Sequence, residues 1–313
     1  MSKQITVVAL FTLLISACAP AGSGEKDLSS APTLKVVATT NMVADLVRTI
    51  GGDHVDLVSL MGPGIDPHLY KASEGDVARM AGADVIFYGG LHLEGKMVDI
   101  FEQMDSRGKR AVAVTDGIDR EKLIESEVFG GHYDPHVWFD VTLWQDAAQY
   151  VTEYLSDINS VNQAVYRSNL DTYLQALSET DTWVRTEVNT LDPGQRVLIT
   201  SHDAFGYFGR AYDFEVYGLQ GISTVAEAGT ADVQSLSTMV AERRIPAMFV
   251  ESSVPRRGIE AVQQAVRAKG FDVTIGGSLF SDALGVEGTP EGTYTGMIRH
   301  NVTTIISGLS ATE

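Results

Sequence analysis

Apolar residues along this chain fall into short, β-branched-rich runs that alternate with segments of helical periodicity. Eight such runs are evident: Leu34–Thr39, Val55–Leu60, Asp84–Tyr88, Ala111–Val114, Arg196–Thr200, Phe214–Tyr217, Ala247–Val250 and Asp272–Ile275. Helical patterns between them cover Met42–Ile50, Asp76–Ala81, Val141–Ile158, Val233–Arg243 and Gly258–Lys269. The alternation predicts an α/β fold of two lobes, each with a mainly parallel four-stranded sheet flanked by helices.

The longest uninterrupted helical pattern lies between these lobes. Apolar residues recur at helical steps from Ser160 to Leu191, and Pro193-Gly194 ends the pattern. One helix of this length would reach roughly 48 Å and would join the lobes rigidly. Two shorter helices that break near Ser178–Thr180 are the alternative, because Ser and Thr are poor residues for helix interiors. The pattern favours the continuous helix.

The N-terminus has the features of a lipoprotein signal. Lys3 precedes an apolar stretch, Ile5–Ile15, that is too short to span a bilayer as a stable helix. Small residues then lead to Cys18, the only cysteine, which we expect to carry the lipid after cleavage. The alternative is an ordinary cleaved signal with a chance cysteine. The mature protein is therefore expected to be exported and anchored, in the periplasm or on the outer face of the cell membrane.

These features divide the chain into five parts. Residues 1–17 are predicted to be the signal peptide and 18–33, rich in Ala, Gly, Ser and Pro, a flexible tether. Residues 34–159 are predicted to form the N-terminal lobe, 160–191 the connecting helix and 192–313 the C-terminal lobe.

The charge excludes one class of partner. Loss of residues 1–17 removes Lys3 and no acid, which takes the formal net charge from −18 to −19. A phosphate backbone would be repelled by this charge, so nucleic acid is not expected as a partner.

Histidines in a repeated context are the candidate chemistry. Asp-Pro-His occurs at Asp66-Pro67-His68 and at Asp134-Pro135-His136, each followed by an apolar-aromatic pair, and His202 lies in Thr200-Ser201-His202-Asp203. Proline fixes its own backbone and favours an extended residue before it, so each histidine would be presented from a stiff loop. Imidazole is the commonest protein ligand for divalent transition metals, so the repeat favours a metal site over incidental surface histidines.

Strand ends supply the rest of the predicted site. His68 follows the strand Val55–Leu60 through a loop, His202 follows Arg196–Thr200, and Asp282 comes after the strand that ends at Ile275. His136 lies just ahead of the helix that Asp140 should cap. Ligands of open α/β sheets gather outside the carboxyl ends of strands. Three imidazoles and one carboxylate, two from each lobe, would fill a four-coordinate shell.

Other residues are weaker candidates. His92 follows a strand end and could line the cleft next to the ligands, and Glu227 and Glu251 are acids that could support them from outside. His54 and His132 are expected to be solvated, and His300 to lie in the core or at the surface.

Longer motifs resemble one family. Met61–Tyr70, Asp134–Asp140, Ser201–Phe208, Phe249–Ser253 and Gly276–Ala283 are similar to the metal-binding receptors of bacterial zinc/manganese ABC importers, and most of all to the TroA-like branch. The likeness runs from Leu34 to the C-terminus. It implies two α/β lobes joined by one rigid helix, Zn²⁺ or Mn²⁺ held between them, delivery to ABC permease subunits, and His68, His136, His202 and Asp282 as ligands. The protein is expected to be a monomer.

The chain departs from both specialised branches of that family. The manganese-selective branch typically has glutamate where this chain has His202, and the zinc branch has a long His-rich loop where Asp116–Tyr133 holds only His132. Zinc, manganese and iron therefore stay open as the natural cargo.

Three functions are compatible with such a site. A transport receptor would bind the metal without chemistry. A metallohydrolase would need an open coordination position and a nearby general base, for which Glu251 or Glu227 could be imagined. A surface adhesin would use the metal structurally. The resemblance favours the receptor.

Overall fold

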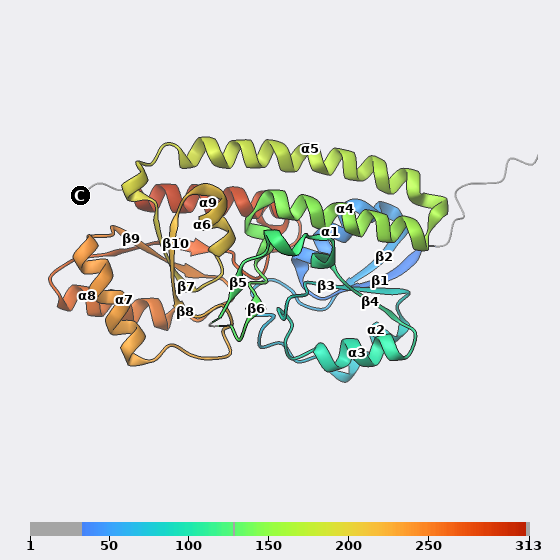
Figure 1. Cartoon of the computed structure of the whole chain (residues 1–313), viewed down its shortest axis with the longest axis horizontal. Coiled ribbons are helices and arrows are strands. Elements are labelled where there is room, and N and C mark those ends of the chain that lie inside the picture. The colour runs from blue at the N-terminus through green and yellow to red at the C-terminus, as the bar shows by residue number, and fades with distance from the viewer. Residues whose placement is uncertain (1–32, 128, 311–313) are drawn as a thin grey trace, which may run out of the picture. The chain divides into compact units, whose positions relative to one another are not determined.

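The computed structural model describes residues 33–127 and 129–310, so Cys18 and the predicted signal and tether lie outside it. The first half contains one parallel sheet in the order β2-β1-β3-β4 (Figure 1). Its strands are β1 (Leu34–Ala38), β2 (Val55–Ser59), β3 (Val85–Tyr88) and β4 (Arg110–Ala113), and its helices are α1 (Asn41–Gly51), α2 (Glu74–Gly82) and α3 (Val98–Ser106). The predicted four-stranded parallel sheet is confirmed.

Burial on both faces explains the apolar strands. In β1, Val36 and Ala38 belong to the core cluster that includes α1, whereas Val37 belongs to the separate cluster under α2 and α3. Phe87 and Ile86 of β3 divide between the two clusters in the same way. Successive residues of a strand point to opposite faces, so a sheet covered on both sides requires apolar residues at every position.

The second half has four strands in two parallel pairs. The strands are β7 (Val197–His202), β8 (Glu215–Gln220), β9 (Ala247–Glu251) and β10 (Thr274–Leu279), and β7 pairs with β8 while β9 pairs with β10. Strands β7 and β9 lie side by side, but the ladder hydrogen bonds stay within the two pairs. At the carboxyl ends of β7 and β9, the carboxylate of Glu251 accepts the backbone N–H of His202. The helices here are α6 (Gly206–Tyr212), α7 (Thr230–Arg243), α8 (Arg257–Ala268) and α9 (Tyr294–Leu309).

Two long helices follow the first sheet. Helix α4 (Val141–Ile158) is capped by Asp140, which accepts from the N–H of Thr142 as predicted. Helix α5 (Gln163–Val188) is continuous, so the prediction of one long helix is confirmed. The hydroxyls of Ser178 and Thr180 donate to the carbonyls of Leu174 and Ala176 one turn earlier, so both residues are satisfied inside the helix and do not break it.

One hydrophobic cluster includes residues from both halves. Helix α9, from the end of the chain, packs against α5, α1 and β10. Its first residue, Tyr294, donates its N–H to Asp45 Oδ2 at 2.9 Å and its hydroxyl to the Trp138 carbonyl at 2.7 Å. The described body is a single compact unit, and the lobe boundaries at residues 159 and 192 remain predictions.

The sequence prediction missed several short elements. Helices α3 and α6 were not expected, nor was the hairpin of β5 (Glu125–Ser126) and β6 (His132–Tyr133). Single 3-10 turns include η3 (Val114–Gly117), η5 (Val137–Phe139) and η6 (Ser160–Asn162). Within residues 33–127 and 129–310, no helix is both long and apolar enough to cross a membrane.

Candidate metal centre

Four side chains from distant parts of the chain converge on one point. His68, His136, His202 and Asp282 each offer a ligand atom, and these atoms all lie within 4.8 Å of one another. Asp282 Oδ2 lies 3.3 Å from Nε2 of His202 and 4.0 Å from Nε2 of His68, and Oδ1 lies 3.4 Å from Nε2 of His136. All four side chains are buried. The structure therefore brings together every residue that the sequence predicted as a ligand.

The chain presents each of them from a strand end or from a loop. His68 lies in the loop after β2, and His136 directly precedes η5. His202 is the last residue of β7, two residues beyond the predicted end of this strand. Strand β10 likewise continues to Leu279, which shortens the connection to Asp282.

Glycine in the neighbouring strand makes room for His202. Gly218 of β8 lies opposite Thr200 in the parallel register. A Cβ at this position would overlap the backbone carbon of His202 and the nitrogen of Asp203. Only glycine allows β8 to approach this closely, so the sequence of β8 helps to fix the end of β7 that carries His202.

Carboxylates orient two of the imidazoles. Asp134 Oδ1 lies 2.7 Å from Nδ1 of His136, and Glu251 Oε2 lies 2.5 Å from Nδ1 of His202. Because a carboxylate accepts hydrogen bonds, each Nδ1 is assigned as the donor, and Nε2 then faces the common point. The same carboxylates also accept the backbone N–H of their histidines. The predicted role of Glu251 in supporting a ligand matches this contact.

His68 is held differently. Asp66 Oδ1 accepts the backbone N–H of His68 at 2.8 Å, but no hydrogen bond joins Asp66 to its ring. Asp66 Oδ2 instead accepts from the hydroxyl of Thr224 at 2.6 Å. In both Asp-Pro-His motifs the aspartate accepts the backbone N–H of its histidine. Asp134 also contacts the ring of its histidine, whereas Asp66 contacts Thr224.

Asp134 and Thr224 were missed by the sequence prediction. The repeat of Asp-Pro-His could have identified Asp134, since the aspartate recurs in both copies. Nothing in the sequence around Thr224 connects it with Asp66, because the two residues are 158 positions apart.

Five buried atoms at the centre lack a hydrogen-bond partner. They are Nε2 of each of the three histidines and both oxygens of Asp282. The short histidine–aspartate distances are thus ion-pair contacts without hydrogen-bond geometry. Buried polar atoms without a partner carry a large desolvation cost. Their convergence fits a site built for a cation.

The pKa values follow from burial and from the surrounding charges. Burial by itself lowers the pKa of His136, but the carboxylates of Asp134 and Asp282 raise it to about 9. His202 also loses solvation, and Glu251 and Asp282 nevertheless raise its pKa well above the usual value. His68 has no such carboxylate on its Nδ1, and burial lowers its pKa to about 3. Burial by itself raises the pKa of Asp282, but the imidazoles of His202 and His136 hold it well below its usual value.

The weaker candidates lie outside the group of four ligands. Glu227 is exposed and forms an ion pair with Arg257 at 2.6 Å, so the structure does not support its predicted contact with the ligands. His92 is exposed, its ring contacts His132 with the centroids 3.9 Å apart, and it lines a cavity together with His68. His54 lies beside Tyr166, and His300 bonds the Ser278 carbonyl.

Residues 36–308 match the family model for the zinc-uptake complex component A, periplasmic, known as ZnuA. The chain belongs to this family. The expected family, the metal-binding receptors of ABC importers, is confirmed.

Relatives in this family carry names for two different metals. The manganese-binding lipoprotein MntA of Bacillus subtilis is 44% identical over 99% of this chain and all of its own length. The zinc-binding protein TroA of Treponema pallidum is 46% identical over 92% of each chain. The manganese transporter lipoprotein PsaA of Streptococcus pneumoniae is 31% identical over 99% of this chain and all of its own length.

Solved structures share the fold. The periplasmic zinc-binding TroA of Treponema pallidum superimposes with a TM-score of 0.87 at 46% identity, over 89% of this chain and all of that one. A second structure, from work on the metal-binding specificity of TroA, gives 0.84 at 33% identity, again over 89% of this chain and all of its own. The predicted α/β fold is therefore confirmed, and the ZnuA family as a whole consists of transport receptors.

Proposed function

We propose that this chain is the extracytoplasmic receptor of an ABC importer that captures zinc or manganese with His68, His136, His202 and Asp282. The observation that carries the proposal is the set of five buried atoms without partners, all of which belong to these four residues. The family names that accompany close relatives, zinc-binding and manganese-binding, support the cargo class. Delivery to permease subunits follows from the role of this family.

The donor set suits a transition metal. Imidazole nitrogen binds zinc, manganese and iron, and the carboxylate of Asp282 supplies the one negative charge in direct reach of the ion. Asp134 and Glu251 hold the imidazoles in the orientation that binding requires, which makes the site preorganised. Two ligands come from each predicted lobe, so we propose that capture needs both lobes, 34–159 and 192–313.

Binding without chemistry fits the surroundings better than hydrolysis. A hydrolase needs a carboxylate that is free to act on a bound water. Glu251 is engaged with both the backbone and the ring of His202, and Glu227 is paired with Arg257 on the surface. We therefore propose a receptor rather than an enzyme.

Metal titration of the metal-free protein tests the proposal. We expect one tight equivalent of Zn²⁺ or Mn²⁺ in competition with a chromophoric chelator, and its loss in His202→Ala. His300→Ala, which lies away from the four ligands, is the matched control and should bind as the wild type does. Unchanged affinity in His202→Ala, with the protein folded by circular dichroism, would contradict the proposed site.

The natural cargo is decided by a second measurement. His202 gives this site three imidazoles, a set that holds Zn²⁺ tightly in vitro whatever the cell delivers. Elemental analysis of protein isolated from the native cell envelope therefore reports the cargo better than affinity does.

Anchoring rests on Cys18, which lies outside the described residues. We propose that Cys18 carries a lipid and that the protein works as a monomer; close relatives are named lipoproteins. Cys18→Ser should release the protein into the soluble exported fraction and leave its metal affinity unchanged. Membrane retention equal to that of the wild type would place the anchor elsewhere.

A further inference from the structure

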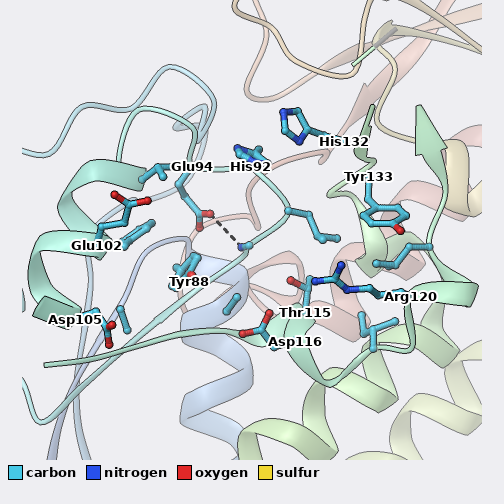
Figure 2. Close-up of a pocket in the computed structure, with 18 of the residues that line it drawn as sticks. Tyr88, His92, Glu94, Glu102, Asp105, Thr115, Asp116, Arg120, His132 and Tyr133 are labelled. Atoms are coloured by element: carbon cyan, nitrogen blue, oxygen red, sulfur yellow. Dashed lines mark hydrogen bonds between the residues drawn. The ribbon is translucent and has the colours of Figure 1, made fainter. Parts of the chain in front are cut away.

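A second pair of histidines lies near the candidate metal centre. His92 comes from the segment that follows β3, and His132 begins β6, yet their ring centroids are only 3.9 Å apart (Figure 2). Both residues are exposed. Neither forms part of the four-residue centre.

The backbone that presents His92 is strained. Leu91 and His92 both have positive φ, 51° and 64°, in the left-handed region that residues with side chains rarely adopt. Consecutive left-handed residues of this kind persist only where the surroundings enforce them, and they cluster at functional sites.

Buried Glu94 enforces this turn. Its Oε1 accepts the N–H of Gly89 at 2.7 Å and the hydroxyl of Thr39 at 2.6 Å, and its Oε2 accepts the N–H of Gly90 at 3.3 Å. A carboxylate that is 1% exposed thereby fixes the two residues just before the strained pair. The position of His92 is thus built into the fold rather than left to a free loop.

The pair stands in the wall between two cavities. The larger, about 760 Å³, lies beyond the ends of β3 and β4, and Tyr88, Thr115 and Asp116 line it together with both histidines (Figure 2). The smaller, about 250 Å³, is also lined by both histidines and reaches His68. The cavity next to the least supported ligand of the metal centre therefore opens past these two imidazoles.

We propose that His92 and His132 form a second, weaker site for a divalent transition metal, at the mouth of the cavity that leads to His68. This proposal rests on the proposed function, because both sites would bind the same class of cation.

Ring rotation would let the two imidazoles share an ion. Rings in the four-residue centre lie 5.3 to 6.0 Å apart, and the rings of His92 and His132 can turn to such a spacing because both side chains are exposed. Loss of part of its hydration, and then the nearby imidazole of His132, lowers the pKa of His92 and keeps its ring in the neutral form that binds metals. With water filling the remaining positions, the site should take Zn²⁺, Ni²⁺ or Cu²⁺ in preference to Mn²⁺.

Titration with Zn²⁺ beyond one equivalent tests this site. Isothermal calorimetry of the full exported chain should show a tight equivalent followed by a weaker one. His92→Gln, His132→Gln and the double variant should each lose the weaker equivalent and keep the tight one. His54→Gln, in which a histidine away from this pair is replaced, is the matched control and should keep both.

Two further variants separate this site from the proposed function. His202→Gln should lose the tight equivalent and keep the weaker one, so a failure at either site is seen on its own. A wild type that binds a single equivalent would overturn the second site. So would a double variant in which the weaker equivalent persists.

Discussion

Thr224 donates its hydroxyl to Asp66 Oδ2 at 2.6 Å, and this bond joins the loop that carries His68 to a segment 158 residues later in the chain. Asp66 is half-buried and Thr224 is buried. Burial raises the pKa of Asp66, and the hydrogen bond from Thr224 opposes that rise. Asp66 in turn accepts the backbone N–H of His68 at 2.8 Å. Thr224 thus reaches the one imidazole ligand that has no carboxylate on its Nδ1.

Replacement of Thr224 by valine should weaken metal retention. A hydrogen bond to a charged group contributes ~1.5–3 kcal/mol, so we expect the metal to dissociate about tenfold to hundredfold faster. Stopped-flow release into excess chelator measures the rate. Thr224→Ser keeps the hydroxyl and should release metal as the wild type does. Equal rates for valine and serine variants would show that the bond to Asp66 does not hold His68.

Glu251, which contacts the ring of His202, should contribute more to metal affinity than an acid on the surface. Glu251→Gln keeps the shape of the side chain but weakens the hydrogen bond to Nδ1 of His202, and loss of such a partner typically costs about 10- to 100-fold in metal affinity. Glu227→Gln makes the same chemical change at an exposed ion pair and should leave affinity unchanged. Competition titrations on both variants decide the point, and equal effects would remove the special role of Glu251.

Replacement of Asp282 by asparagine should change metal preference. Mn²⁺ depends on oxygen ligands and should lose more affinity than Zn²⁺, which three imidazoles still bind. Asp282 is fully buried among the imidazoles, so its charge acts on them directly.

The variant should therefore also lower the pKa of His136 and His202, because Asp282 raises both. Competitive titration with the two metals measures the first effect, and NMR titration of the rings measures the second. Equal loss for Zn²⁺ and Mn²⁺ would exclude a role in selectivity.

Metal affinity should rise with pH up to about pH 9. In the metal-free protein the pKa of His136 is raised to about 9, so its ring holds an extra proton at neutral pH. The pKa of His202 is raised as well, so its ring is protonated too. A metal must displace these protons, whereas the lowered pKa values of His68 and Asp282 mean that these two groups have none to lose. We expect release of about two protons per ion near pH 7. Calorimetry in buffers of different ionisation enthalpy counts them; zero release would contradict the assignment.

The sequence by itself determined most of the longer elements and the ligand types. Short apolar, β-branched-rich runs predicted β1 to β4 and β7 to β10, because such residues favour strands of a covered parallel sheet. The absence of Gly and Pro from Ser160 to Leu191 predicted the long helix. The repeated Asp-Pro-His and the positions of His202 and Asp282 near strand ends identified four residues that the fold does bring together.

Only the tertiary structure decided what surrounds those four residues. The structure shows that Glu251, and not Glu227, contacts a ligand. It also shows that Asp66 bonds Thr224 and that His92 meets His132. These contacts join segments up to 158 residues apart. Local patterns carry no information about such contacts, because loop direction and side-chain rotamers are set by packing across the whole core. The same packing fixes the protonation of the ligands, since burial and neighbouring charges, rather than residue type, move their pKa values.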